Sequence, residues 1–168
     1  MIRRHAEWRL MTIADIPEVD AIGEVVHPDF PEDIAVMENR QTLFPQGCFV
    51  AQGAEKPLGY AISHPSVIGE PAPLDTIIKL PENADCLFLH DIALSEDARG
   101  LGLGSQIVPL LKKAAKDAGF DRLGLVSVNN SLGFWKSQGF KVLMPDDKLK
   151  AKLETYGEDA AYMVLAIT

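Results

Sequence analysis

Apolar and polar residues follow two periods along the chain, and each change of period marks an expected element. Residues 16–26 carry apolar side chains three and four positions apart, which predicts an amphipathic helix capped by Thr12 or Asp15. A second helix is expected over 32–43, because the fixed φ of Pro31 suits a first helical turn. The sequence therefore predicts two consecutive helices in the first quarter of the chain.

Short apolar segments bounded by turn residues predict about seven strands. They are expected over residues 8–13, 47–52, 58–63, 87–94, 121–128, 139–143 and 161–167. Residues 65–84 contain a glycine and several prolines, so they predict a long loop with one short helix or strand near 74–80. Loops of this length in compact domains are usually functional or mobile, and this one is expected near the acceptor end of the molecule.

The most informative pattern lies between Cys86 and Phe140. An apolar run predicts a buried strand, and the stripe of apolar residues from Ile107 to Ala118 predicts a helix packed on a sheet by one face, with Pro109 near its start. The residues between them are Arg-Gly-Leu-Gly-Leu-Gly. Glycines at a strand-to-helix turn let a diphosphate approach the backbone, where the helix presents unpaired amides. The alternative is a glycine-rich connection that only turns the chain.

Known phosphate-binding motifs separate these interpretations. A Walker loop requires a lysine that is absent after Gly104, and the dinucleotide fingerprint requires a third glycine where Ser105 stands. The spacing of Arg99, Gly102 and Gly104 instead fits Arg-x-x-Gly-x-Gly. With this loop the chain resembles the GNAT family of N-acetyltransferases. The resemblance extends to three further segments, 89–94 for the family's fourth strand, 125–128 for its fifth, and 134–140 for its Phe-Tyr-x-x-x-Gly-Phe passage.

The resemblance implies a fold and a cosubstrate. The fold is of the α/β (α+β) class, with a mixed, mostly antiparallel sheet of about seven strands, helices on both faces, and splayed strands 4 and 5. Residues 1–168 form a single acetyltransferase domain, as the length also suggests. Acetyl-CoA is the implied cosubstrate, and no metal is expected. The implied coenzyme-binding residues are Ile92, Ala93, Leu94, Arg99, Gly100, Leu101, Gly102, Leu103, Gly104, Ser105, Asn130, Ser131 and Trp135.

Catalysis is expected at the middle of the fourth strand. The resemblance assigns the backbone amide of Ile92 to the thioester oxygen, as an oxyanion donor. His90 is the candidate base, because alternation along a strand places it on the same face as Ile92, and Asp91 is a second candidate facing the other way. The alternative for His90 is a hydrogen-bonded core histidine. The resembled family often has a tyrosine that protonates the leaving thiolate, and this chain has Trp135 at that position. The proton could instead come from solvent, from the ammonium product, or from Tyr156 or Tyr162.

The acceptor is expected to be the primary amine of a small molecule or peptide. In the resembled family the connection between the first two helices helps to wall the acceptor pocket, so Phe30, Glu32 and Asp33 are substrate candidates. The alternative is a solvated turn at these positions.

Composition narrows the partners. The 168 residues carry a net charge of -8, and a pI near 4.9 argues against nucleic acid and suits a cationic amine. Cys48 and Cys86 are far apart in apolar segments, which predicts reduced core residues rather than a disulfide or metal site. Without an apolar run of membrane-spanning length or a signal-peptide pattern, the expected location is the cytoplasm, away from membranes. Homodimers are common in the resembled family, and the sequence leaves the oligomeric state open.

Three function classes therefore compete. The first is an acetyl-CoA-dependent N-acetyltransferase that works by direct attack of the amine. The second is an inactive coenzyme-A-binding sensor or interaction module, suggested by Trp135. The third is another kind of nucleotide-binding α/β domain, made less favourable by the missing lysine and third glycine.

Overall fold

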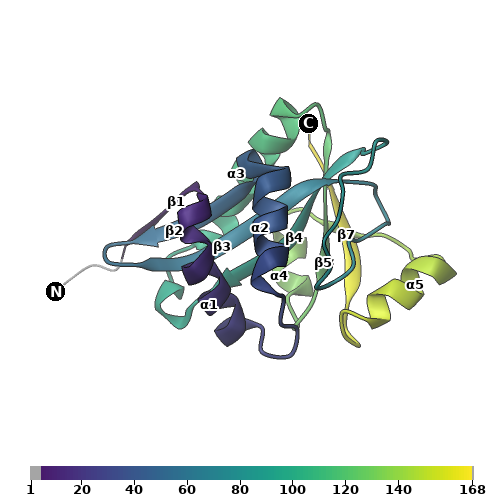
Figure 1. Ribbon diagram of the computed structural model, residues 1–168. Helices are drawn as coiled ribbons and strands as arrows, with labels where there is room; N and C mark the ends of the chain where they lie inside the picture. The colour runs from purple at the N-terminus through teal and green to yellow at the C-terminus, as the bar shows by residue number, and fades with distance from the viewer. Residues whose placement is uncertain (1–4, 168) are drawn as a thin grey trace.

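A seven-stranded sheet forms the centre of the protein in a computed structural model that describes residues 5–167 (Figure 1). The strand order is β1-β2-β3-β4-β5-β7-β6, and among these described strands only the β4–β5 pair is parallel. The strands are β1 (Ala6–Leu10), β2 (Cys48–Gly53), β3 (Pro57–Ser66), β4 (Cys86–Leu94), β5 (Arg122–Ser127), β6 (Lys141–Val142) and β7 (Ala161–Ala166). The expected mixed, mostly antiparallel sheet is confirmed.

Within residues 5–167, five α-helices cover the two faces of this sheet. They are α1 (Ile16–Val26), α2 (Ile34–Leu43), α3 (Leu103–Asp117), α4 (Leu132–Ser137) and α5 (Asp147–Glu154). Helices α1 and α2 lie over one face, and α3 lies behind the other (Figure 1). Apolar residues of α1 pack on β2 and β3, whereas those of α3 pack on β4, β5 and β7. The expectation of helices on both faces is therefore confirmed.

Local chemistry sets the helix boundaries. Helix α1 has the predicted bounds, but α2 begins later than predicted, because the Asp33 side chain caps it by accepting a hydrogen bond from the Ala35 N–H at 2.9 Å. Helix α3 begins after Gly102, whose φ of 71° is left-handed. Pro109 is tolerated inside α3 on its exposed side, where the carbonyl left without a helical partner can bind water.

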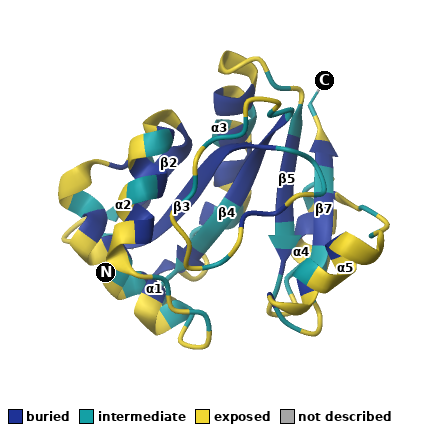
Figure 2. Ribbon diagram, turned by 45° about the vertical axis from the view of Figure 1, so that its right-hand side comes forward, coloured by how far each residue is buried: buried dark blue, intermediate teal, exposed yellow. Residues whose placement is uncertain are grey.

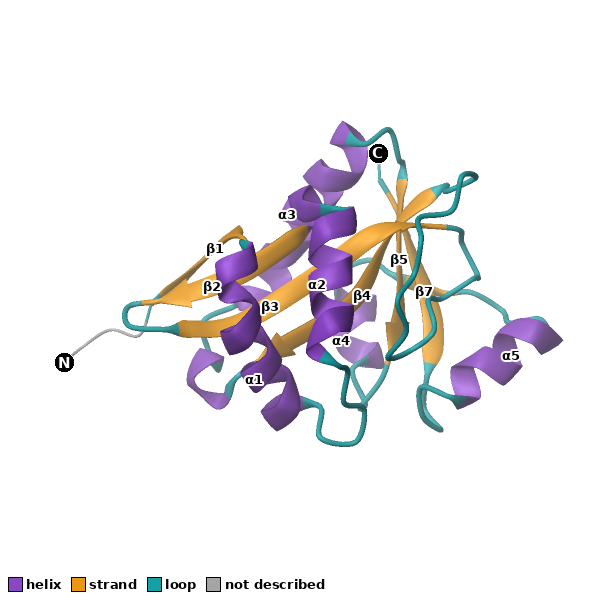
Figure 3. Cartoon of the chain, viewed as in Figure 1, coloured by secondary structure: helices purple, strands orange, loops and turns teal. Residues whose placement is uncertain are grey.

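Strands β4 and β5 separate along their length. Their pairing covers only Leu87–Leu89 on one strand and Leu123–Leu125 on the other, although β4 continues to Leu94. In Figure 3 the two strands meet at one end and diverge toward the other. The predicted splay is confirmed, and it opens the sheet beside the second half of β4.

Burial follows the sheet: in Figure 2 most of its strand residues are dark blue, the second half of β4 is largely teal, and the outer faces of the helices are yellow. Cys48 and Cys86 are buried free thiols, as predicted, and burial raises the pKa of each to about 12. Among residues 5–167, no helix is long and apolar enough to cross a membrane.

The long connection between β3 and β4 differs from the prediction. Residues 67–85, all of them described, contain turns but no helix or strand. Side-chain contacts shape the segment instead: Asp75 accepts a hydrogen bond from the Asp33 N–H at 2.6 Å, and Asn39 bonds both backbone groups of Ile78. Tyr156 donates its hydroxyl to the carbonyl of Ala72. These contacts hold the loop along α2, from Asp33 to Asn39, and against Tyr156. The partners lie far from the loop in the sequence, so local sequence patterns do not predict its conformation.

Candidate functional site

A β-bulge shifts the alternation of side chains in β4. Asp91 lies opposite Ile62 and Leu89 lies opposite Ser63, so His90 is an extra residue in the ladder. Both His90 and Asp91 consequently reach the segment between α1 and α2. The prediction that His90 shares a face with Ile92, with Asp91 facing away, is wrong, because strict alternation does not hold across a bulge.

Backbone direction differs between neighbouring residues of β4. The Ser95 N–H donates to the Leu58 carbonyl at 2.8 Å, and hydrogen-bonded pairs recur every second residue in an antiparallel ladder. Ala93, opposite Tyr60, therefore uses its backbone groups on β3. Those of Ile92 and Leu94 point the other way, into the gap left by β5.

The direction of these backbone groups argues against the predicted coenzyme contact of Ala93 and supports those of Ile92 and Leu94. The backbone of Ala93 bonds to β3 and is therefore not free for a coenzyme arm, and its side chain is buried on the α1 side of the sheet. Ile92 and Leu94 line the opening, and the Ile92 carbonyl already accepts a hydrogen bond at 3.1 Å from the ring of His27.

The glycine-rich turn presents free amides at the start of α3. The first N–H groups of a helix have no partner within it, and the first helical bond here runs from the Gln106 N–H to the Gly102 carbonyl. Within residues 5–167, no side chain caps this end. A Cβ added to Gly104 would lie 2.9 Å from the Phe134 ring, which explains that glycine by close packing. The predicted anion site thus has a helix N-terminus available.

The turn and the splay share one cavity of about 590 Å³. Its walls come from β4, the glycine turn, the end of β5 and α4. Predicted residues that line it include Ile92, Leu94, Arg99, Gly100, Gly102, Leu103, Gly104, Ser105, Ser131 and Trp135. Arg99 is exposed there, and its side chain makes no hydrogen bond or ion pair with the described residues.

Two further predicted coenzyme residues lie outside this cavity, and Trp135, which lines it, is nearly covered. Leu101 lies on the other side of the turn, in a separate hollow with Trp8 and Pro109. Asn130 donates its backbone N–H to Asp159 at 2.7 Å, and the preceding Asn129, at a φ of 53°, lines the cavity instead. Trp135 reaches the cavity but is only 5% exposed, packed edge-on against the rings of Phe134 and Phe140.

A second cavity of about 60 Å³ opens beside the first. Its walls include Phe30, Glu32, Leu74 and Tyr156. Six residues line both cavities, which places their junction at the bulge and the end of β5: His27, His90, Asp91, Val126, Val128 and Asn129. Of the three predicted substrate residues, Phe30 and Glu32 lie here. Asp33 does not, because it faces solvent and caps α2.

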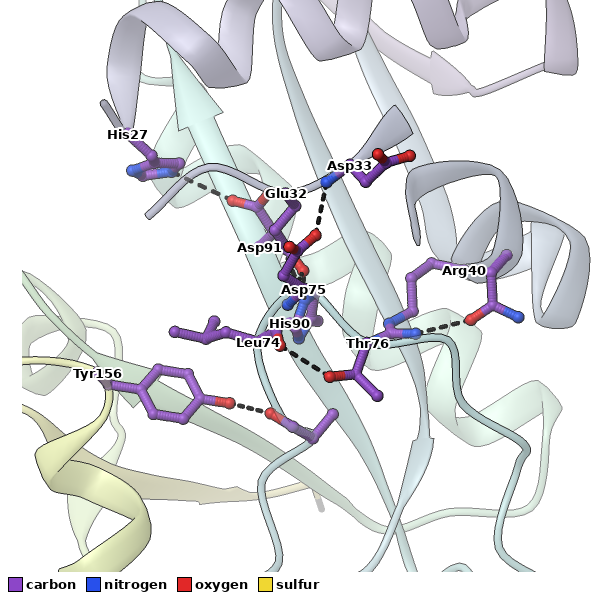
Figure 4. Close-up of polar contacts among 12 residues, drawn as sticks. His27, Glu32, Asp33, Arg40, Leu74, Asp75, Thr76, His90, Asp91 and Tyr156 are labelled. Atoms are coloured by element: carbon purple, nitrogen blue, oxygen red, sulfur yellow. Dashed lines mark hydrogen bonds and ion pairs between the residues drawn. The ribbon is translucent and has the colours of Figure 1, made fainter. Parts of the chain in front are cut away.

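His90 and Glu32 form one of two histidine–carboxylate pairs at this junction (Figure 4). His90 Nε2 lies 3.0 and 3.2 Å from the Glu32 oxygens, and the two side chains are 1% and 8% exposed. Burial acts to raise the pKa of Glu32, but the hydrogen bond and charge of His90 outweigh it and hold that pKa below its ordinary value. Glu32 also accepts the Asp75 N–H at 3.0 Å.

His27 and Asp91 form the second pair, which the sequence analysis missed. His27 Nε2 lies 3.1 Å from an Asp91 carboxylate oxygen, and the Tyr60 hydroxyl donates to the other oxygen at 2.6 Å. The hydrogen bond to Asp91 raises the pKa of His27 and outweighs the effect of burial. The signal in the sequence is a histidine at a helix end, directly before Pro28, but its partner lies far away in the chain.

Two more polar side chains are buried behind His90. His64 lies with its ring centroid 5.9 Å from that of His90, and burial, the largest cause, lowers its pKa to about 3. Arg40 is fully buried and donates from Nη1 to the Asn39 side chain at 2.7 Å. Its pKa is lowered by burial, which the charge of Glu32 opposes. Because its pKa is lowered this far, His64 is neutral at physiological pH, and it supports the ring of His90 by packing.

The two tyrosines proposed as acids lie in different places. Tyr156 borders the second cavity, although its hydroxyl is bound to Ala72, and burial raises its pKa. Tyr162 is fully buried, stacked on Phe88 at 6.0 Å, away from both cavities. Neither tyrosine borders the cavity that holds the glycine turn.

Comparison of the sequence with protein families gives one match. The sequence model of the acetyltransferase (GNAT) family matches residues 11–140, most of the chain. No curated protein matches the chain in sequence.

Comparison of the structure gives many neighbours with the same fold. The ribosomal-protein-S18-alanine N-acetyltransferase from Escherichia coli superposes with a TM-score of 0.68 and 19% identity, over 98% of this chain and 95% of that one. A phosphinothricin acetyltransferase from Sinorhizobium meliloti, solved with acetyl-CoA, gives 0.66 and 20%, over 96% and 88%. The loading GNATL domain of CurA from Lyngbya majuscula gives 0.77 and 13%, over 96% and 98%. At such identities the neighbours share a fold with this chain, and its chemistry has to be argued from its own site.

Proposed function

Because the chain belongs to the acetyltransferase (GNAT) family, we propose that it transfers an acetyl group from acetyl-CoA to the primary amine of a small molecule or peptide. The observation that carries the proposal is the position of Ile92. Its backbone points into the gap between β4 and β5, with free helix amides on one side and a carboxylate-lined cavity on the other.

The donor side is assigned to the larger cavity. The amides from Gly100 to Ser105 surround the pyrophosphate, where the helix N-terminus favours negative charge. Arg99 is exposed beside them and binds a phosphate rather than the loop. The backbone of Ile92 and Leu94 then pairs with the pantetheine arm as an added strand would. The phosphinothricin acetyltransferase that shares this fold was solved with acetyl-CoA.

The thioester is placed beside Ile92, whose N–H supports the oxygen as negative charge develops on it. An oxyanion donor contributes only when it is aimed at the position of the charged oxygen and is not engaged elsewhere. The divergence of β5 leaves this amide without a strand partner, and the diverging strands also give the acyl group its path into the sheet.

The acceptor side is assigned to the smaller cavity. Glu32 and Asp91 bring two carboxylates to its walls, and the net charge of the chain is negative. A cationic amine suits such a site, because its charge is balanced where it is taken from water. Phe30 and Leu74 add apolar contacts for the carbon skeleton next to the amine.

Trp135 is assigned to binding rather than acid catalysis. Its ring belongs to the core between α3 and the sheet and only its edge reaches the cavity. An indole N–H donates a hydrogen bond but does not release a proton near neutral pH. The sulfur of coenzyme A therefore takes its proton from the attacking nitrogen as the amide forms.

The test combines binding and turnover. Acetyl-CoA, coenzyme A and adenosine 3′,5′-bisphosphate are compared in thermal shift, and released thiol is then measured with 2-phenylethylamine, spermidine, lysine and a hexapeptide with a free α-amino group. We expect both coenzymes to raise the melting temperature and at least one amine to release thiol. Stabilisation without turnover of any amine would favour the inactive coenzyme-binding module. Equal stabilisation by the bisphosphate alone would favour a different nucleotide-binding function.

A further inference from the structure

The side chain of His27 is fixed at the junction of the two cavities. Its backbone N–H closes α1 on the Gly23 carbonyl at 2.8 Å, and its own carbonyl accepts the Phe30 N–H at 3.1 Å. Pro28 follows and cannot continue the helix. These constraints fix the backbone of His27, and the contacts of its ring with Ile92 and Asp91 hold the side chain where it borders both cavities.

The contacts of the ring determine its tautomer. Nε2 lies 3.1 Å from the carbonyl of Ile92, which can only accept, so Nε2 carries a hydrogen. The same nitrogen faces Asp91 at 3.1 Å. In the neutral ring the lone pair is then on Nδ1, which makes no hydrogen bond with any residue in the described range 5–167. A histidine held in this way by a carboxylate is arranged to accept a proton at its other nitrogen.

Charged groups on every side favour that protonation. Asp91 on β4 contacts the ring directly and is itself held by the Tyr60 hydroxyl of β3. Glu32 adds its charge from the segment before α2. The ring shares a small cleft with Asp20 and Glu24 of α1, and the buried His90 lines both cavities with it. The hydrogen bond to Asp91 is the largest cause, and with the charges of Asp91 and Glu32 it outweighs burial and holds the pKa of His27 above its ordinary value.

His90 is less suited to exchange protons. Its side chain is 1% exposed against 20% for His27, and its Nε2 is committed to Glu32. Its Nδ1 is buried without a hydrogen-bond partner among the described residues. A base must release its proton between turnovers, and the ring of His27 has a route to solvent that His90 lacks.

We propose that His27 is the general base of the reaction, and that Asp91 and Tyr60 are positioning residues that hold its ring. This inference rests on the proposed function. Nδ1 takes a proton from the acceptor ammonium, directly or through one water, and releases it to solvent. The neutral nitrogen attacks the thioester carbon, the C–N bond forms, and the C–S bond breaks. The second proton leaves nitrogen with the departing sulfur, which gives the amide and the free thiol of coenzyme A.

The test compares His27→Gln, His90→Gln and Asp91→Asn, with His5→Gln as a control on an exposed histidine. Glutamine keeps an N–H for Asp91 but is no base. We expect His27→Gln to lower kcat/KM at about pH 7 by roughly 100-fold, in the range of general-base catalysis, and by far less at about pH 9.5, where more amine is free. Asp91→Asn should move the acidic limb of the pH–rate profile to lower pH, because the pKa of His27 falls. His5→Gln should match the wild type.

The outcomes distinguish a failure of the role of His27 from a failure of the proposed function. Each variant is first shown to keep the thermal shift with acetyl-CoA, so that loss of rate is not loss of fold. A rate and pH profile unchanged in His27→Gln but lost in His90→Gln would overturn the role of His27 and return it to His90. A wild-type protein that binds acetyl-CoA and turns over no amine would overturn the proposed function, and the role of His27 with it.

Discussion

The two cavities that meet at the bulge of β4 are built in opposite ways. The donor cavity is made largely of consecutive backbone, from Ile92 through the glycine turn to Ser105. The smaller cavity, which we assign to the acceptor, is lined from five separate parts of the chain, near residues 27–32, 74, 90–91, 126–129 and 156. A site made of peptide groups depends on the path of the chain, whereas a site made of side chains depends on which charges are brought together.

Their electrostatics differ accordingly. The donor side offers backbone N–H dipoles at a helix N-terminus, which can bind a phosphate although the N–H groups themselves carry no formal charge. The acceptor side offers two carboxylates, each already in contact with a histidine. Substitutions that change backbone freedom should therefore act on coenzyme binding, and substitutions that change charge should act on the acceptor.

The largest expected effect is on the donor side, in Gly102→Val. A β-branched residue at a φ of 71° is strained by about 1–2 kcal/mol, and relief of that strain turns the amides away from the phosphates. We expect the Kd for acetyl-CoA to rise about 100-fold, equivalent to roughly 2.7 kcal/mol, as measured by calorimetry. Gly133→Ala is the matched control, since a Cβ there meets open space within α4. Unchanged affinity in Gly102→Val would contradict the assignment of the turn to phosphate.

The next effect is on the acceptor side, in Glu32→Gln. The substitution removes the charge that faces His90 and keeps the size of the side chain. Losing a partly buried charge–charge contact of about 1.4 kcal/mol raises the KM for a cationic amine roughly tenfold, with the Kd for acetyl-CoA unchanged. Asp33→Asn serves as the control, because asparagine caps α2 as well as aspartate does and the residue lies outside the cavity. Equal effects of the two substitutions would refute a substrate role for Glu32.

A smaller effect is expected from the loop that covers the acceptor side. Asp75→Ala removes the acceptor for the Asp33 N–H, and the strained φ of 50° at this position favours aspartate over alanine. We expect faster hydrogen exchange across residues 72–80 and a KM for the amine raised about threefold, worth roughly 0.6 kcal/mol. Glu82→Gln, exposed in the same loop, should change neither quantity. Exchange that stays slow in Asp75→Ala would show that the other anchors suffice.

The smallest effect is on stability and follows from the raised pKa of His27. A histidine whose folded pKa is raised contributes stability that is complete below its unfolded pKa near 6.5 and is lost as pH rises through the folded pKa. The difference in unfolding free energy between wild type and His27→Gln should therefore shrink from about pH 6 to higher pH, as followed by denaturant titration. In an Asp91→Asn background that dependence should weaken. A difference that grows with pH would mean that folding lowers the pKa of His27 instead of raising it.

Much of the fold was predictable because its signals are local. The bounds of α1, the glycine turn before α3 and the apolar run of β4 follow from periodicity and from residues with special backbone freedom. The glycine turn on the donor side could be predicted for the same reason, since Arg99, Gly102 and Gly104 are neighbours in the chain. The sequence analysis assigned Asn130 to the coenzyme, whereas Asn129 lines the cavity. Both asparagines are left-handed in the turn, and no local sequence rule predicts which of the two faces the cavity.

The sequence by itself determined where a glycine turn would meet the start of a helix, because helix ends and strand periods are properties of contiguous residues. The opening of the sheet beside that turn was implied by the family resemblance and is seen in the short pairing of β4 with β5. The tertiary structure alone decided which side chains gather where the two cavities meet. One extra residue in the β3–β4 ladder turned His90 and Asp91 toward the same segment, and it paired Asp91 with a histidine from α1. Pairing across strands and packing of helices on them fix such contacts, and neither is encoded by spacing along the chain.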